Sequence, residues 1–235
     1  MKKSITILLC VSLAAAVAML AIYASRQKAP FYAGRPLNYW VHEFRAGGPR
    51  REKAEAAFRA MGTNAVPFLI AALNKKESFF HRNYAAVVRR LPAAVQPLFL
   101  RSREAPEFLR ARAAVTLADM RAPATSNTVA ALRRAVDDPF FGARNNAVVA
   151  IGNTAPKTSA AAQAVAALIH ATKDTNFMVR ANAYWQLGKF LPEASEAIPV
   201  LQRGLSDPES RVRTAAEHGL SLIGVAPTSN TGTNR

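Results

Sequence analysis

The chain has 235 residues, of which half are hydrophobic, 31 are Lys or Arg, 15 are Asp or Glu and one is Cys. A chain this apolar can bury a substantial core, so a fully disordered protein is excluded. A single cysteine excludes an internal disulfide framework and a thiolate metal cluster. The net charge of +16 favours acidic partners or surfaces but carries no information about the fold.

Residues 1–30 are predicted to be a targeting segment. Two lysines precede an uncharged apolar run at 5–23. As a helix, this run of 19 residues would span about 28 Å, close to the thickness of a bilayer core. An uncleaved signal anchor and a cleaved signal peptide both stay open, the second because Ala16 and Ala18 form a small-x-small cleavage pattern. In a bacterial cell, either places the rest in the cell envelope, anchored in the inner membrane facing the periplasm or exported after cleavage.

The rest of the chain is organised by an internal repeat. Each copy has an Arg, an Ala three residues later and an apolar residue seven later, and these offsets share one helix face. The copies are Arg51/Ala54/Phe58, Arg110/Ala113/Leu117, Arg144/Ala147/Ile151, Arg180/Ala183/Leu187 and Arg213/Ala216/Leu220, with a weaker copy at Arg82/Ala85. The arginines are separated by 31, 28, 34, 36 and 33 residues. A repeat of this length predicts stacked supersecondary units.

A second apolar helix is expected after each of the first five copies. These helices cover 65–70, 94–99, 128–132, 164–168 and 197–201. Gly62, Gly152, Gly188 and Gly224 are expected to end the first helices as C-terminal caps. No alternating strand pattern with hairpin turns is present in the sequence. The sequence therefore predicts about eleven helices, arranged in pairs, and no strands.

Three features of this pattern resemble HEAT repeats, in the HEAT-like variety also found in phycobilisome lyases. An Asp precedes the Arg by six residues in the pairs Asp138/Arg144, Asp174/Arg180 and Asp207/Arg213. A Pro precedes the last Asp by eight residues, and a hydrophobic-Arg-x-x-Ala phrase recurs. The resemblance covers about 38–225, and its first half is degenerate because Lys76 and Glu104 stand six residues before Arg82 and Arg110.

The resemblance implies an all-α fold. We expect a right-handed α-solenoid of five to six HEAT-like helix pairs over 31–225, preceded by the N-terminal membrane or signal helix. The aromatic stretch 31–40 is expected to cap the open end of the first repeat, with Asn38 as the N-cap of a helix from Tyr39 to about Arg45. Residues 226–235, rich in Thr, Asn and Gly, are expected to be a disordered tail.

The Asp and Arg residues of the repeat are interpreted as a structural ladder. The carboxylate can accept backbone N–H bonds at the turn, and the guanidinium can bridge toward the next repeat. Such a pair fixes register more reliably than it adds stability. Binding of an anionic ligand by these arginines is the alternative interpretation.

No set of residues in the sequence matches a catalytic motif. HEAT-like enzymes of the deoxyhypusine hydroxylase type hold two irons with several His-Glu pairs, whereas this sequence has one, at His42-Glu43. No nucleophile elbow, phosphate-binding loop or zinc-protease helix occurs. We therefore expect no enzyme, no metal and no cofactor. Tyr184 and Trp185 are expected to be core residues rather than a stacking platform.

Charge is the remaining functional signal. Residues 29–235 carry 27 basic and 15 acidic residues, a net charge of +12. Arg133, Arg134 and Arg203 are expected on an exposed face of the second helices. The main hypothesis is a non-enzymatic scaffold that binds an unidentified protein. The alternatives are a basic surface for a polyanion, lipid headgroup or nucleic acid, with export arguing against nucleic acid, and a HEAT-like lyase or glycosylase.

Overall fold

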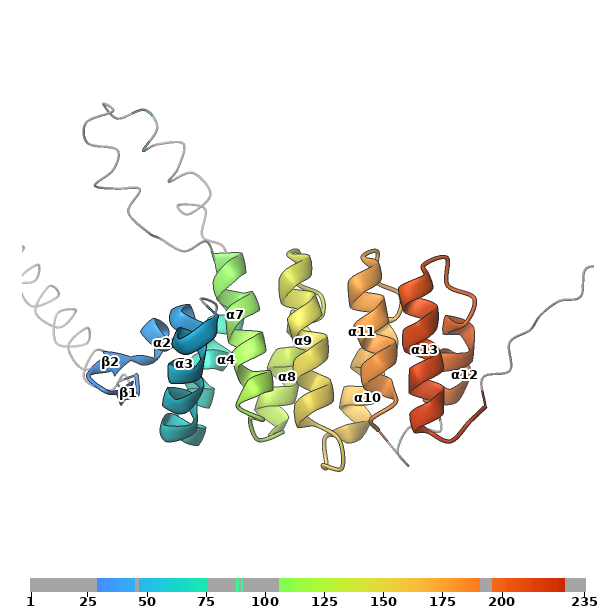
Figure 1. Cartoon of the computed structure of the whole chain (residues 1–235), viewed down its shortest axis with the longest axis horizontal. Helices are drawn as coiled ribbons and strands as arrows, with labels where there is room; N and C mark the ends of the chain where they lie inside the picture. Colours follow the sequence, from blue (N-terminus) through green and yellow to red (C-terminus); the bar gives the residue numbers. More distant parts are fainter. Residues whose placement is uncertain are drawn as a thin grey trace, which may run out of the picture. The chain divides into compact units, whose positions relative to one another are not determined.

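The computed structural model describes residues 29–44, 47–75, 88, 90, 106–190 and 196–226. Residues 1–28 of the predicted targeting segment at 1–30, and residues 227–235 of the predicted tail at 226–235, lie outside these residues. Residues from Phe31 onward form one compact unit. Figure 1 shows its helices in two layers, with the first helix of each pair in front of the second. The fold is an all-α solenoid.

The helix pairs follow one another along the chain. The first helices are α3 (Gly48–Met61), α7 (Pro106–Asp119), α9 (Phe141–Thr154), α11 (Phe177–Leu187) and α13 (Ser210–Leu222). The second helices are α4 (Val66–Leu73), α8 (Ser126–Ala135), α10 (Ala161–Ala171) and α12 (Ala197–Gly204). A short 3-10 helix, η2 (Gly62–Ala65), joins α3 to α4. Each first helix from α7 onward packs against the second helix that precedes it, and α7, α9 and α11 also pack against the next first helix.

The repeat pattern marks the core. The alanines three residues after the repeat arginines, Ala54, Ala113, Ala147, Ala183 and Ala216, are all fully buried. The apolar residues seven after the arginines, Phe58, Leu117, Ile151, Leu187 and Leu220, are also buried. One continuous apolar core includes members of every helix pair, as expected for repeats that cannot bury their apolar faces alone.

The aromatic N-terminal stretch packs on the first repeat but contains two short strands. β1 (Phe31–Tyr32) pairs with β2 (Arg35–Pro36) in an antiparallel hairpin, so the expectation of no strands is wrong at this point. Helix α2 (Leu37–Glu43) follows and packs against α3. Trp40 is buried, and its Nε1 donates to the carbonyl of Tyr32 at 3.1 Å. This bond ties the hairpin to the helix that covers the first repeat.

Asn38 is not the N-cap of α2. The helix begins one residue earlier than Asn38, and the N-cap is Pro36, whose side chain has no acceptor for the first backbone N–H groups. Asn38 instead accepts from the N–H of its neighbour Tyr39 at 3.1 Å. The hairpin delivers the chain in the extended conformation an N-cap needs, with Pro36 at ψ 160. The start of α2 is therefore set by the extended backbone at Pro36 and not by a side chain that caps the helix.

Gly152 is not a helix cap either. It lies inside α9 and is buried. A Cβ at this position would lie 2.1 Å from Oε1 of Gln186 on α11, so only glycine fits here. The glycine serves close helix approach rather than helix termination. Gly62 and Gly224 do follow their helices with positive φ angles of 51 and 73, which glycine adopts without a steric penalty.

α4 and α7 are in direct contact although residues 76–105 separate them in sequence. Every other second helix connects to the following first helix through a short turn. The weaker repeat copy at Arg82 and the predicted helix at 94–99 fall within 76–105 and lie outside the described residues, apart from Val88 and Arg90. The structure therefore describes four helix pairs and the single helix α13 within its described ranges.

α13 has the character of a terminal cap. Four residues after the repeat arginine, the interior first helices carry the buried residues Ala114, Val148 and Tyr184, whereas α13 carries the exposed Glu217. Eight residues after it, the interior residues are small and buried, whereas α13 has the exposed Ser221. A polar outer face is what the end of a repeat array needs to stay soluble.

Arg121 ends α7 in a left-handed conformation, with φ 46. Ala122 N–H donates to the Leu117 carbonyl and Arg121 N–H to the Ala118 carbonyl, the bonding pattern that ends α13 at Gly224. A side chain at this conformation is strained. Arg121→Gly is therefore expected to stabilise the chain by about 0.5–1 kcal/mol. Urea unfolding of the two proteins measures the difference, and a less stable Arg121→Gly variant would mean that the Arg side chain makes a compensating contact.

Among the described residues, one stretch, Gly48–Leu73, is long and apolar enough by composition to cross a membrane. In the structure, this stretch is not one continuous helix. The 3-10 turn η2 interrupts it, and Phe58 of α3 and Leu69 of α4 are part of the common core. The core helices of a repeat explain its hydropathy.

Candidate functional site: the Asp–Arg ladder and the faces it holds

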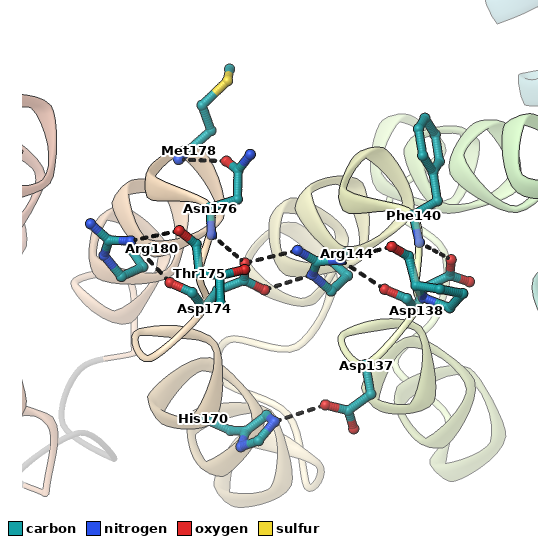
Figure 2. Close-up of polar contacts among 11 residues, drawn as sticks. Asp137, Asp138, Phe140, Arg144, His170, Asp174, Thr175, Asn176, Met178 and Arg180 are labelled. Atoms are coloured by element: carbon teal, nitrogen blue, oxygen red, sulfur yellow. Dashed lines mark hydrogen bonds and ion pairs between the residues drawn. The ribbon is translucent and has the colours of Figure 1, made fainter.

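Three ion pairs link consecutive repeats. Arg144 binds Asp174 through Nε and Nη2 at 2.6 and 2.9 Å (Figure 2), and Arg180 binds Asp207 in the same way at 2.9 and 2.9 Å. Arg110 binds Asp138 with the same pair of nitrogens. Each pair is bidentate and largely shielded from solvent. Two parallel hydrogen bonds fix direction as well as distance.

Two of the three arginines that form rungs, Arg144 and Arg180, also hold their own turns. Nη1 of Arg144 donates to the carbonyl oxygens of Asp138 and Pro139 at 2.9 and 3.2 Å (Figure 2). Arg180 does the same at Asp174 and Thr175. One guanidinium therefore fastens the turn that precedes its helix and the turn of the next repeat together.

The carboxylates complete the network by organising the turns. Oδ1 of Asp138, Asp174 and Asp207 accepts from the backbone N–H two residues later at 2.9, 2.8 and 3.0 Å. Asn176 then caps α11 by accepting from Met178 N–H at 2.9 Å (Figure 2). Each rung thus satisfies backbone groups at a helix start that would otherwise be unpaired.

Arg110 is a rung that the sequence places in the repeat but not in the Asp–Arg spacing. The residue six positions before it, Glu104, lies outside the described residues. Nη1 of Arg110 donates to the carbonyl of Lys75, just after α4, at 3.2 Å. A repeat alignment that scored the Arg alone, without the preceding Asp, would have found this rung.

Arg213 is the last arginine of the ladder. Its Nη1 donates to the carbonyls of Asp207 and Pro208 at 2.8 and 3.0 Å, as in the interior repeats. No described residue supplies a following carboxylate, because the described array ends with α13. Arg213 thus holds its own turn without a next repeat.

The rungs lower the pKa of two carboxyl groups. The hydrogen bond from Arg180 holds the pKa of Asp207 below its ordinary value, with help from the Glu209 N–H, against the opposing effect of burial. For Asp174, burial opposes ionisation, but the bonds from Arg144 and Asn176 outweigh it, so its pKa is also lowered. Both groups are therefore carboxylates at neutral pH.

These pKa shifts make stability fall in acid. A lowered folded-state pKa contributes stability above the unfolded-chain value of about 3.9 and loses it as pH falls through the folded-state pKa. We expect the free energy of unfolding to decline below about pH 4, and to decline less steeply in Arg180→Gln, where Asp207 loses its main partner. Urea titrations at a series of pH values measure both slopes. Equal acid slopes in the two proteins would show that this rung is not the source.

The second helices carry a row of basic residues at equivalent positions. Arg134, His170 and Arg203 each lie four residues before a turn aspartate and are exposed. Arg133 is also exposed but lies one position earlier, where the other repeats have Ile169 and Gln202. The structure thus places Arg134 and Arg203 in one register, and Arg133 outside it. His170 Nε2 lies 2.8 Å from Oδ1 of Asp137, as Figure 2 shows.

The first helices α9 and α11 present a different face, which carries no charged side chain apart from the ladder arginines. Nδ2 of Asn182 donates to Oδ1 of Asn145 at 2.7 Å, and Nδ2 of Asn146 donates to the carbonyl of Ala111 at 2.9 Å. Trp185 is 40% exposed and stacks on His218, with the ring centroids 3.6 Å apart. Tyr184 is buried as expected, but the expectation that Trp185 is a core residue is wrong.

The joint between the first and second described pairs is more open than the others. A cleft of about 520 Å³ lies between α3 and α7 and is lined in part by Glu55, Arg59 and Asp119. Glu55 and Arg59 occupy repeat positions that are small or apolar and buried in α7, α9 and α11. Arg51 reaches across, 2.9 Å from Glu55 and 3.6 Å from Asp119. Charged residues at the contact positions explain the gap.

No metal-binding cluster emerges in the part of the chain that the structure describes. Among those residues, no group of three or more His, Cys, Asp or Glu side chains is placed to hold a metal ion. His42 is exposed on α2 and does not belong to such a group.

Stacked helix pairs, with a bidentate rung at each of the three joints from α7 onward, define an α-solenoid repeat protein. The family model of HEAT repeats matches residues 138–221, from the first turn aspartate into α13. This part of the chain therefore matches HEAT repeats, as the sequence resemblance implied, and repeat proteins of this kind generally act as interaction scaffolds. A designed armadillo repeat protein, YIII(Dq)4CqI, is structurally similar at 17% identity and a TM-score of 0.37, covering 80% of this chain and 99% of that chain. The search of curated proteins gives no match.

Proposed function

We propose that the chain is a non-enzymatic scaffold of the cell envelope that binds another protein. The observation that carries the proposal is the ladder of bidentate rungs, in which each guanidinium joins two consecutive turns. Rungs of this geometry hold neighbouring pairs in one register, so residues from separate repeats line up into an extended, preformed surface. A preformed surface lowers the ordering cost of binding.

The proposal includes a membrane location. The apolar run at 5–23, flanked by Lys2 and Lys3, supports a signal anchor or a signal peptide. Either places the repeats in the envelope, where the partner would also be found. Fractionation of cells that produce the full chain tests this location. A protein recovered only in the cytoplasm would contradict it.

A pull-down from envelope extract tests the binding function. The full chain, held in mild detergent, is the bait, and the washes use low and high salt. The matched control is the chain with Asp138→Ala and Asp174→Ala, which lacks two rungs. We expect a protein partner that is retained in both washes and lost with the control bait, once circular dichroism shows that this bait is still helical, because the surface depends on register. Equal recovery with both baits, or no partner, would contradict the scaffold function.

A basic surface for an anionic partner is the second candidate. The exposed row of Arg134, His170 and Arg203 and the net charge of +12 over 29–235 favour it. Binding of this kind weakens steeply as salt rises. Sedimentation with vesicles that contain anionic lipid, at two salt concentrations, measures it, and salt-independent binding would rule the electrostatic mechanism out.

A further inference from the structure

A groove lies on the second-helix side of the open joint, between α4 and α8. Its volume is about 560 Å³, within the range of about 300–1,000 Å³ that ligand sites occupy. Val66 and Ile70 of α4 and Ala130 of α8 contribute apolar surface. Ile70 and Ala130 remain partly exposed although both belong to apolar helices. This groove therefore leaves apolar surface uncovered within the fold.

Part of the rim of the groove is polar and uncharged. Thr63, Thr125 and Asn127 line it, and all three are exposed. Hydroxyl and amide side chains both donate and accept hydrogen bonds, which matches the alternating N–H and C=O groups of a peptide backbone. The groove shares Thr63 and Val66 with the cleft between α3 and α7. A bound peptide could therefore contact the protein through more than one of its residues.

Arg134 gives the groove a positive charge. It lies in the last turn of α8, and Asn74 Oδ1 accepts from its Nε at 3.3 Å. No carboxylate of the described residues forms an ion pair with Arg134, since Asp137 is engaged with His170 and Asp138 with Arg110. An oriented guanidinium beside an apolar groove favours an acidic group next to an apolar one.

We propose that the groove between α4 and α8 binds a peptide segment of a partner protein, with an apolar side chain against Ile70 and Ala130 and a carboxylate against Arg134. The inference rests on the proposed scaffold function and locates one of its contact sites. The charge of Arg134, the apolar wall and the hydrogen-bonding rim together determine which kind of peptide fits the groove.

Selection from a library of random 12-residue peptides tests this site. The full chain in mild detergent is the target, and the affinity of the enriched peptides is then measured by fluorescence anisotropy. We expect the enriched peptides to share an apolar residue next to Asp or Glu. We expect Arg134→Glu to weaken their binding by about tenfold or more. Ala130→Tyr, which fills the groove, is expected to weaken it similarly.

The matched control is Arg203→Glu, which makes the same charge change at the equivalent position of α12. It is expected to leave peptide binding within about twofold, because only the general field of the protein changes. Equal losses in Arg134→Glu and Arg203→Glu would show a diffuse charge effect and overturn the site. Enriched peptides without an acidic residue, or no enrichment, would also overturn it. These results would leave a partner captured by the pull-down in place, so failure of the site is distinguishable from failure of the scaffold function.

Discussion

Replacing Asp138 with alanine is expected to lower the free energy of unfolding by about 3–5 kcal/mol, because it leaves the buried guanidinium of Arg110 without its carboxylate. Both side chains are only 7% exposed. The substitution also removes the acceptor for the Phe140 N–H at the start of α9. Urea unfolding of the full chain in detergent, followed by circular dichroism, measures the change.

Asp137→Ala is the matched control for this prediction. Asp137 is the neighbouring residue and also forms an ion pair, with His170, but the two side chains are 67% and 64% exposed. Exposed pairs contribute little, so the expected change is within about 0.5 kcal/mol. Similar losses of stability in the two variants would show that the buried Asp138–Arg110 pair contributes no more than an exposed ion pair. That result would contradict the structural role of the ladder.

Gly188→Leu is expected to destabilise the chain by about 2–3 kcal/mol. Gly188 ends α11 where α11 packs on α13, and a Cβ there would lie 2.7 Å from Cα and 2.9 Å from the carbonyl oxygen of Gly219. Those atoms belong to the backbone, so a rotamer change of a neighbour cannot relieve the clash. The helices must separate or shift, which opens the core of the last repeat. Thermal and urea unfolding both report this loss.

Ser221→Leu provides the control, because Ser221 holds the same repeat position on α13. No described helix packs on that face, and Ser221 is exposed. The expected change is within about 0.5 kcal/mol. Equal destabilisation of the two variants would mean that α13 is covered on its outer face and is not the end of the array.

The periodic part of the fold could be predicted from the sequence. The Arg-x-x-Ala phrase places Ala147 and Ala183 at fully buried contacts, because offsets of three, four and seven define one helix face. The position of the turn aspartates likewise indicated where backbone N–H groups need an acceptor. Local spacing was sufficient because each repeat contacts only its neighbours.

The departures from the repeat could not be predicted, since each depends on contacts between elements. Gly152 resembles a helix cap in sequence and is in fact a contact point for Gln186. Trp185 follows a buried residue but stacks in solvent on His218, which is 33 residues later in sequence. The groove at Ile70 and Arg134 exists because α4 lies beside α8, although residues 76–105 intervene between the two pairs.

In the proposed function, the ladder supports binding by holding consecutive helix pairs in one register. Rungs at the turns fix the angle between consecutive pairs, so residues from α4, α8, α10 and α12 line one extended side of the array. Interaction on that side needs no catalytic group, only a partner surface of matching shape and charge. The joint between α4 and α8 adds an apolar groove with a positive end, so it offers more specific contacts than the basic row alone.

Photo-crosslinking from the two faces tests the binding function most directly. The full chain, produced in its own cells, carries a photoreactive residue at Ala130 on α8 or, as the matched position on the other layer, at Asn153 on α9. We expect a protein adduct from position 130 that persists in high salt and disappears in the Asp138→Ala, Asp174→Ala background. Adducts only from position 153, or no protein adduct from either, would contradict a scaffold that binds through its second helices.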